Sequence, residues 1–190
     1  MVRAAHYFAD GWALNMWQVA EPAKIRRDLH QIRRDGFNTI IVLVPWRGYQ
    51  TDQLVPRYDP FYVAQLQRVL KAAEQENLEV IVRASYLHHS LEQNVPSAFA
   101  MVNRLREDPE TRNAWLHYLR HLHQICKPYR SFRQAFISWE EFWGSFIKQQ
   151  RYELTRRERL MESSGFAQFL QDQNITGISA IPEAHEPAFE

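Results

Sequence analysis

Apolar residues recur along this chain in two alternating patterns, which are short continuous runs and longer stretches in which they return every three or four positions. The runs are Ala4–Ala9, Thr39–Val44, Leu78–Ala84 and Gln134–Glu140, and the second reads TIIVLV. A run that is apolar at successive positions and rich in β-branched residues favours a strand covered on both faces, as in a parallel sheet. The pattern therefore predicts four parallel strands.

The stretches between these runs have the period and the end signals of helices. One helix is expected to begin at Pro22 and another after Asp59, which suits the N-cap position before a proline. A third is expected from about Pro109. The pattern turns helical again through Tyr152–Gln171, where Thr155 fits the start of a capping box.

Strand and helix alternate four times, and this order predicts an α/β fold with right-handed crossovers. A doubly wound sheet and a (β/α)8 barrel both satisfy it. The barrel is favoured because residues suited to a site follow every expected strand, whereas a doubly wound sheet concentrates its ligand at one switch point. A full barrel needs roughly 250 residues. We therefore expect a TIM-barrel type truncated to about the first four βα units, as one domain over residues 1–190.

The tryptophans gather after the expected strands. Aromatic residues make up 13% of the chain, which holds six Trp. Those that follow a strand run are Trp12, Trp17, Trp46, Trp139 and Trp143. Because the carboxyl ends of parallel strands meet at one edge, these indoles are expected to line one cleft. Indole faces pack against the apolar faces of sugar rings, so carbohydrate is the expected ligand.

Polar side chains suited to ligand contact lie in the same expected loops. Asn15 follows the first strand, Arg47 the second, and Arg83 lies near the end of the third, with His88 and His89 beyond it. An arginine at a strand end is costly to bury alone, which implies a carboxylate or substrate partner. The two histidines are suited to bonding sugar hydroxyls. Without a spaced third ligand, we expect no metal.

The segment Gln134–Phe146, QAFISWEEFWGSF, ends a strand-like run in two carboxylates. Consecutive strand residues point to opposite faces, so only one of Glu140 and Glu141 can address a barrel axis. Glu140 is favoured because it continues the strand, while Glu141 suits the first turn of a following helix. An ion pair with Arg83 is the alternative role for Glu140. Asp10 is another acid at a strand end, but a turn role is favoured for it.

Four segments that each follow one expected strand carry a family resemblance. In order they read GWALNMW, VPWRGYQ, VRASYLHH and SWEEFW. Together they resemble the N-terminal half of a clan A glycoside hydrolase, the (β/α)8 retaining β-glycosidases and endoglycanases, over roughly residues 4–170. The resemblance implies hydrolysis of O-glycosidic bonds in an oligo- or polysaccharide, without a cofactor.

In that clan a strand-4 Glu, here Glu140, is the general acid/base, and the nucleophile follows the seventh strand. The acid is commonly preceded by Asn, but here by Trp139, so Glu140 and Glu141 both remain open. The nucleophile is expected to be absent from this chain, and whether the chain turns over a substrate by itself stays open. The alternative from another class is a non-catalytic carbohydrate-binding or assembly protein that uses the aromatic cleft.

Charge and composition limit the classes of partner and the cellular location that we expect for this chain. A formal net charge of +1 gives no overall attraction to nucleic acid, and no run approaches the roughly 18 apolar residues of a membrane span. The N-terminus lacks the apolar core of a signal peptide, so a cytoplasmic location is expected by default, and secretion if a leader precedes it. Cys126, the single cysteine, is expected to be buried and inert. A half-barrel exposes strand edges, so we expect self-association or a missing C-terminal half as its partner.

Overall fold

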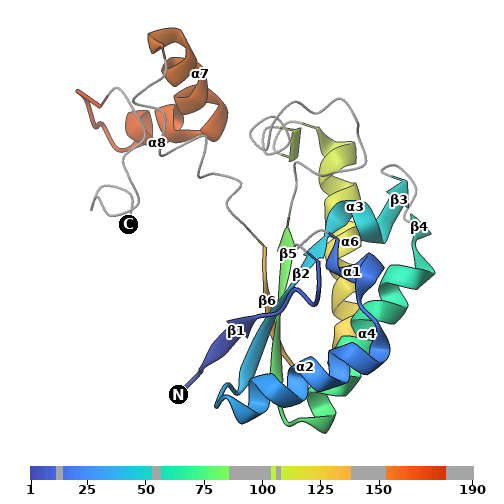
Figure 1. The fold of residues 1–190 in the computed structure, drawn as a ribbon. Helices are drawn as coiled ribbons and strands as arrows, with labels where there is room; N and C mark the ends of the chain where they lie inside the picture. Colours follow the sequence, from blue (N-terminus) through green and yellow to red (C-terminus); the bar gives the residue numbers. More distant parts are fainter. Residues whose placement is uncertain (12–14, 53–56, 86–103, 106–107, 138–152, 179–190) are drawn as a thin grey trace.

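The computed structural model of the 190-residue chain describes residues 1–11, 15–52, 57–85, 104–105, 108–137 and 153–178. Its central element is a four-stranded sheet made of β1 (Ala4–His6), β2 (Thr39–Pro45), β5 (Glu79–Ser85) and β6 (Phe132–Phe136). All three pairings are parallel, and the order β1-β2-β5-β6 follows the chain (Figure 1). The expected parallel α/β sheet is confirmed, and its sequential order argues against a doubly wound arrangement.

The helices begin largely where local signals predict. They are α1 (Met16–Val19), α2 (Pro22–Arg34), α3 (Trp46–Tyr49), α4 (Pro60–Gln75), α6 (Pro109–Cys126), α7 (Leu154–Ser164) and α8 (Phe166–Asp172). Asp59 caps α4 by accepting a hydrogen bond from the Phe61 N–H at 2.8 Å. Asp108 caps α6 by accepting from the Glu110 N–H at 3.0 Å. In both helices a proline occupies the first position, where its missing N–H costs nothing.

Several predicted boundaries are wrong. The first strand ends at His6 rather than Ala9, because the chain turns away from β2 after Tyr7. The fourth strand is Phe132–Phe136, with a register irregularity against β5 near its start. The final helix is interrupted at Gly165, whose φ of 81° lies in the left-handed region that glycine adopts freely. Because α7 begins at Leu154, Thr155 lies inside the helix instead of capping it, and the N-cap Glu153 makes no side-chain cap bond.

An unpredicted hairpin-like pair follows α3. The strands β3 (Gln50–Asp52) and β4 (Arg57–Tyr58) pair antiparallel as a separate small sheet. The Asp59 N–H then donates to the Tyr49 carbonyl oxygen at 2.9 Å, which returns the chain to the start of α4.

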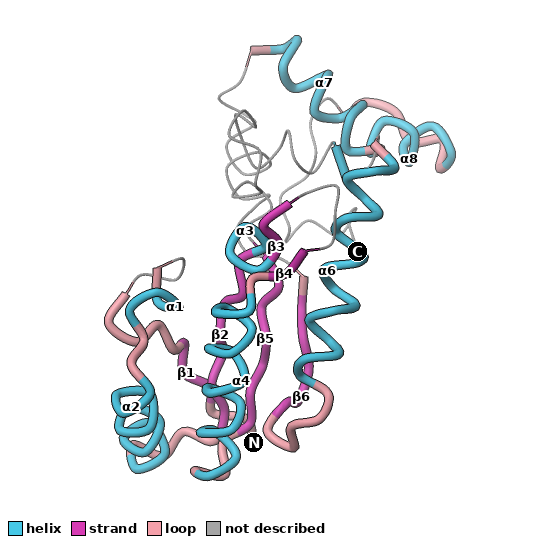
Figure 2. Tube along the Cα trace, turned by 90° about the vertical axis from the view of Figure 1, so that its right-hand side faces the viewer, coloured by secondary structure: helices cyan, strands magenta, loops and turns pink. Residues whose placement is uncertain are grey.

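One face of the four-stranded sheet carries the main core. Figures 1 and 2 show α2, α4 and α6 on the same side of the strands. The residues that point to these helices are fully buried, among them Val42, Val44, Val82 and Ala84. Cys126 is buried there as predicted, and burial raises the pKa of its thiol to about 12. The thiol is thus a packing group, not a nucleophile.

The helices α7 and α8 contact each other and share a small cluster of their own, formed by Met161, Phe166 and Leu170. No helix in the described part of the chain is both long and apolar enough to cross a membrane.

Candidate functional site

The second face of the sheet carries a different set of side chains near the carboxyl ends of the strands. Leu43 lies opposite Arg83 in the β2–β5 register, and Arg83 lies opposite Phe136 in the β5–β6 register. Because side chains alternate along a strand, these residues point away from the face on which Val42 and Val82 meet the helices. They form one row across three neighbouring strands.

Arg83 is the charged member of this row. Its guanidinium carbon lies 4.7 Å from the centre of the Phe136 ring, within range of a cation–π contact. The contact lies across two adjacent strands, so the sheet itself sets the position of the guanidinium. A planar cation held in this way presents its N–H fork in a fixed direction, which suits a carboxylate or vicinal hydroxyls.

His6 is the last residue of β1, and Phe8 follows it in the turn that leads away from the strand. Their rings stack with centroids 5.6 Å apart and an interplanar angle of 28°. The pKa of His6 is lowered, first because its ring is partly shielded from water and second by the positive charge of Arg83. A neutral imidazole offers one hydrogen-bond donor and one acceptor. This part of the sheet therefore combines a permanent cation with a neutral polar ring.

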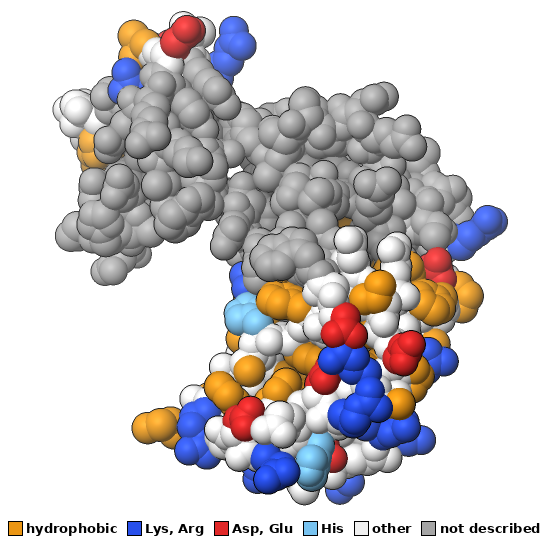
Figure 3. Space-filling view, in the orientation of Figure 1, with side chains coloured by type: hydrophobic (Ala, Val, Ile, Leu, Met, Phe, Trp, Pro, Cys, Tyr) orange, Lys and Arg blue, Asp and Glu red, His pale blue; other side chains and the backbone are white. Residues whose placement is uncertain are grey.

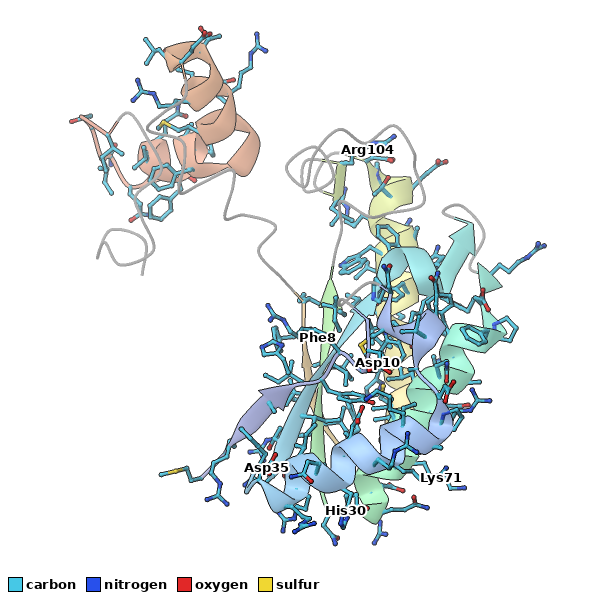
Figure 4. The ribbon with its side chains drawn as sticks, in the orientation of Figure 1. Phe8, Asp10, His30, Asp35, Lys71 and Arg104 are labelled. Atoms are coloured by element: carbon cyan, nitrogen blue, oxygen red, sulfur yellow. The ribbon has the colours of Figure 1, made fainter. Side chains whose placement is uncertain are left out.

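Asp10 is fixed in a structural role just beyond. Ala9 has a φ of 48°, and the Gly11 N–H donates to the Phe8 carbonyl oxygen at 3.1 Å, which closes a turn (Figure 4). The Asp10 carboxylate is 61% exposed and forms an ion pair with the Lys24 ammonium at 3.2 Å. Lys24 also bonds Asp28 at 2.9 Å. The favoured turn role of Asp10 is thus supported.

Trp17 and Trp46 are core residues, and this corrects the expectation that five indoles line an open cleft. Trp17 is 0% exposed, and its indole N–H donates to the Leu43 carbonyl oxygen at 2.8 Å. Trp46 is 1% exposed, and its N–H donates to the Gln50 side-chain oxygen at 2.7 Å. The Trp46 ring also meets Trp115 edge-on at 4.9 Å between centroids. Neither indole presents a face to a ligand, because each chain segment folds back over the helix side of the sheet.

Two of the remaining candidate site residues, Asn15 and Arg47, lie in the part of the chain that the structure describes. Asn15 is exposed at the N-cap of α1 and makes no side-chain cap bond. Arg47 lies in α3, at the carboxyl end of β2. The candidates outside the described residues are Trp12, His88, His89, Trp139, Glu140, Glu141 and Trp143. The described part of the chain has no group of three His, Cys, Asp or Glu side chains arranged to hold a metal ion.

His6, Phe8 and Phe136 are not among the site residues predicted from the sequence, although the sequence contains a signal for the first two. Strand side chains repeat with a period of two, so the predicted run Ala4–Ala9 already places His6 and Phe8 on one face. The observed strand ends at His6, and the Phe8 ring stacks on the His6 ring from the turn beyond it. The role of Phe136 depends on the β5–β6 register, which only the pairing of two distant segments defines.

The fold is similar to solved structures of GH5_18 glycoside hydrolases. A variant of GH5_18 from Bifidobacterium longum subsp. longum, in complex with Manβ1-4GlcNAc, matches with a TM-score of 0.63 and 13% identity over 86% of this chain and 40% of that one. GH5_18 from Streptomyces cattleya, in complex with GlcNAc, matches with a TM-score of 0.61 and 20% identity over 86% of this chain and 41% of that one.

The exo-β-1,4-mannosidase Op5Man5 from an Opitutaceae bacterium matches with a TM-score of 0.62 and 18% identity, over 86% of this chain and 29% of that chain. The chain thus spans between 29% and 41% of the length of these proteins. No protein-family model and no curated protein sequence matches it. The predicted likeness to clan A glycoside hydrolases is confirmed at the level of the fold.

Proposed function

We propose that this chain is a glycoside hydrolase-like protein that acts on O-glycosidic bonds of an oligo- or polysaccharide, with Glu140 as its general acid/base. The observation that carries the proposal is the sequential parallel sheet, which presents Arg83 and His6 near the carboxyl ends of its strands. In barrels built from such sheets, the site lies at this end. The likeness in fold to GH5_18 glycoside hydrolases supports the same assignment.

Chain connectivity supports the placement of Glu140 near this site. β6 ends at Phe136, and an extended residue spans at most about 3.6 Å, so Glu140 lies within about 14 Å of Phe136. Phe136 contacts Arg83 directly. In the proposed reaction Glu140 protonates the departing glycosidic oxygen and later accepts a proton from water.

Arg83 is proposed to bind the sugar instead of pairing with Glu140. A proton donor needs a carboxyl whose pKa is raised, and a guanidinium in direct contact with it lowers that pKa. The two roles therefore exclude a direct Arg83–Glu140 ion pair during catalysis. His6, held neutral beside Arg83, is suited to bonding a hydroxyl of the same sugar.

The substrate class that we propose is a β-mannoside. One of the similar structures holds Manβ1-4GlcNAc, and another similar protein is an exo-β-1,4-mannosidase. This chain spans 40% of the first of these proteins and 29% of the second. The β-mannoside is therefore a proposal for this chain, and it is tested on this chain directly.

Double displacement also needs a second carboxyl about 5 to 5.5 Å from the first. Asp10 is engaged with Lys24, so we propose that the nucleophile comes from beyond the four βα units. β6 is an edge strand whose residues 133–136 are all exposed, and β1 is the opposite edge. We propose that these edges pair with a further half-barrel, either a second copy of this chain or a C-terminal half.

The test compares the wild-type chain with Glu140→Gln and Glu141→Gln on a panel of aryl β-glycosides that includes the β-mannoside. The proposal expects turnover when the chain is paired with its further half-barrel, and Glu140→Gln is expected to reduce it by about 10³-fold, in line with the loss of general acid catalysis and leaving-group protonation. Glu141→Gln is the matched control, expected within about fivefold of wild type.

The binding alternative has a distinct outcome in the same experiment. A change in tryptophan fluorescence with Manβ1-4GlcNAc, without any turnover, favours a carbohydrate-binding protein. That alternative is favoured by the ion pair of Asp10 with Lys24, which removes the other acid at this end of the described sheet from catalysis. Neither binding nor turnover of any glycoside would contradict both assignments.

A further inference from the structure

A cavity of about 550 Å³ opens at the amino ends of the strands, at the opposite end of the sheet from the candidate site. Three of its lining residues are arginines and one is an acid. The full lining is Met1, Val2, Arg3, Arg33, Asn38, Asn77, Glu79 and Arg133. Figure 3 shows Lys and Arg side chains on the lower part of the molecule, with Asp and Glu side chains among them. With three arginines and one acid in its lining, the cavity is positively charged.

Asn38 fixes the chain that carries Arg3. The Arg3 N–H donates to the Asn38 side-chain oxygen at 2.8 Å, and the Asn38 side-chain amide donates to the Met1 carbonyl oxygen at 2.9 Å. The Asn38 N–H also donates to the Arg3 carbonyl oxygen at 3.0 Å. Residues 1–3 are thus tied to the start of β2 from both sides. Met1, Val2 and Arg3 form one wall of the cavity.

The other two arginines come from separate elements. Arg33 lies in the last turn of α2, and its guanidinium reaches the Phe37 carbonyl oxygen at 3.4 Å. Arg133 lies at the start of β6 and forms an ion pair with Glu79 at the start of β5. Glu79 also accepts a hydrogen bond from the Thr39 hydroxyl at 3.4 Å. One carboxylate therefore orients one arginine, and the charges of Arg3 and Arg33 remain in excess over it.

We propose that this cavity binds a phosphate group, either as inorganic phosphate or as the phosphomonoester of a small molecule. Guanidinium forks match phosphate oxygens in bidentate geometry, and a concave site of one sign concentrates counter-ions. A phosphate dianion offsets the excess charge of Arg3 and Arg33, while Glu79 keeps Arg133 directed at the cavity. The volume exceeds what a phosphate alone occupies, which leaves room for an organic part. The proposal is independent of the sugar chemistry proposed at the other end.

Arg33 and Arg34 provide a matched pair for the test. Both are exposed in the last turn of α2, but only Arg33 lines the cavity. Phosphate binding is measured by calorimetric titration of the 190-residue chain at constant ionic strength, with chloride replaced by inorganic phosphate. We expect saturable binding that Arg33→Gln weakens about tenfold or more, since it removes a charged hydrogen bond. Arg34→Gln is expected to stay within about twofold of wild type.

A second readout reports on the cavity itself. In ¹⁵N–¹H spectra, the side-chain amide of Asn38 is expected to shift with phosphate in wild type and in Arg34→Gln. Arg3→Gln replaces Arg33→Gln if the latter does not fold. Equal loss in Arg33→Gln and Arg34→Gln, an unmoved Asn38 amide, or titration without saturation would overturn the proposal as general charge screening.

Glucose 6-phosphate serves as the second probe and separates the two sources of the phosphate group. Tighter binding than inorganic phosphate, with the same dependence on Arg33, indicates that the cavity also holds the organic part. Equal affinity with the same dependence indicates that only the phosphate group is contacted. Binding of glucose 6-phosphate that is indifferent to Arg33 contradicts the site.

Discussion

Arg83 and Phe136 meet across neighbouring strands, and this contact explains how the sheet directs a guanidinium at its carboxyl end. The sequence predicted that Arg83 belongs to a site, because it lies near the end of an apolar strand. It could not identify Phe136 as its neighbour, since that contact depends on a register between segments about 50 residues apart.

Replacing Arg83 by lysine is expected to weaken the binding of Manβ1-4GlcNAc by about tenfold or more, because an ammonium keeps the charge but loses the planar, stacked fork. The measurement is a fluorescence titration with the disaccharide. Arg57→Lys, at an exposed position of β4, is the control and is expected to bind as wild type does. Unchanged affinity in Arg83→Lys would contradict the proposed role of Arg83 in sugar binding.

His6 gives a prediction about pH. Its pKa in the folded protein is lowered from the value of about 6.5 that is expected in the unfolded chain. The folded state therefore binds fewer protons at this histidine than the unfolded state does. The free energy of unfolding should therefore fall as the pH drops below that value. Urea unfolding at about pH 7.5 and about pH 5.5, on either side of that pKa, should show a smaller drop for His6→Gln than for wild type. The pKa of His121 is also lowered, so the unfolding free energy of His6→Gln is still expected to fall between the two pH values. An equal fall in His6→Gln and wild type would contradict the lowered pKa of His6.

The buried tryptophans show a limit of reasoning from single residues. Trp17 and Trp46 both follow strands, as aromatic residues in sugar clefts do, yet both pack in the core. Position after a strand does not say whether the chain continues over the open end or folds back over the helices. Only the tertiary contacts, such as the Trp17 bond to the Leu43 carbonyl oxygen, distinguish the two.

At the scale of elements, local end signals predicted the helices well. Asp59 and Pro22 act within one turn of their own helix, so no distant contact is needed to interpret them. Strand ends were predicted less well, because a strand ends where its pairing with the neighbouring strand ends, and that depends on distant segments. β1 is short because the chain turns away from β2 after Tyr7, and the helix after residue 152 is interrupted at Gly165, where the left-handed conformation overrides the helical pattern.

Replacing Asp59 by alanine should lower the free energy of unfolding by about 1 kcal/mol, because the Phe61 N–H loses its acceptor at the start of α4. Chemical denaturation measures the change. Glu153→Ala, at an N-cap whose side chain makes no cap bond, is the control and should change stability by less than about 0.5 kcal/mol. Equal effects would show that the Asp59 cap adds nothing.

A buried tyrosine links α6 to the sheet and offers a second stability test. The Tyr118 hydroxyl donates to the Val44 carbonyl oxygen at 2.7 Å within the core. Tyr118→Phe leaves that buried oxygen without its donor, at an expected cost of about 1 to 3 kcal/mol in unfolding free energy. Tyr58→Phe, at a partly exposed position, is the control. A Tyr118→Phe variant with an unchanged unfolding free energy would argue against the hydrogen bond from Tyr118 to Val44.

At the scale of the whole molecule, the fold is a parallel sheet with the helices α2, α4 and α6 on one face and both edges open in the part of the chain that the structure describes. Parallel sheets are ordinarily covered on both faces. The sequence predicted this architecture from the repetition of strand and helix. Glu140 and Glu141, which follow β6, lie outside the described residues, so the catalytic role of Glu140 stays a prediction.

The open edges predict self-association of this 22.7 kDa chain. Light scattering coupled to size exclusion should show a mass that rises with concentration. Ile137, 59% exposed just after β6, provides the test: Ile137→Asp should lower the association while leaving the thermal stability of the monomer unchanged. A monomer at all concentrations, or a mass indifferent to Ile137, would contradict pairing at this edge.

A crystal structure of the Glu140→Gln chain with Manβ1-4GlcNAc tests the central claim most directly. The account predicts the disaccharide at the carboxyl ends of the strands, the substituted side chain at position 140 within about 2.6 to 3.2 Å of the glycosidic oxygen, and Arg83 on a sugar hydroxyl. A disaccharide bound elsewhere, or a side chain at position 140 directed away from the glycosidic oxygen, would contradict it.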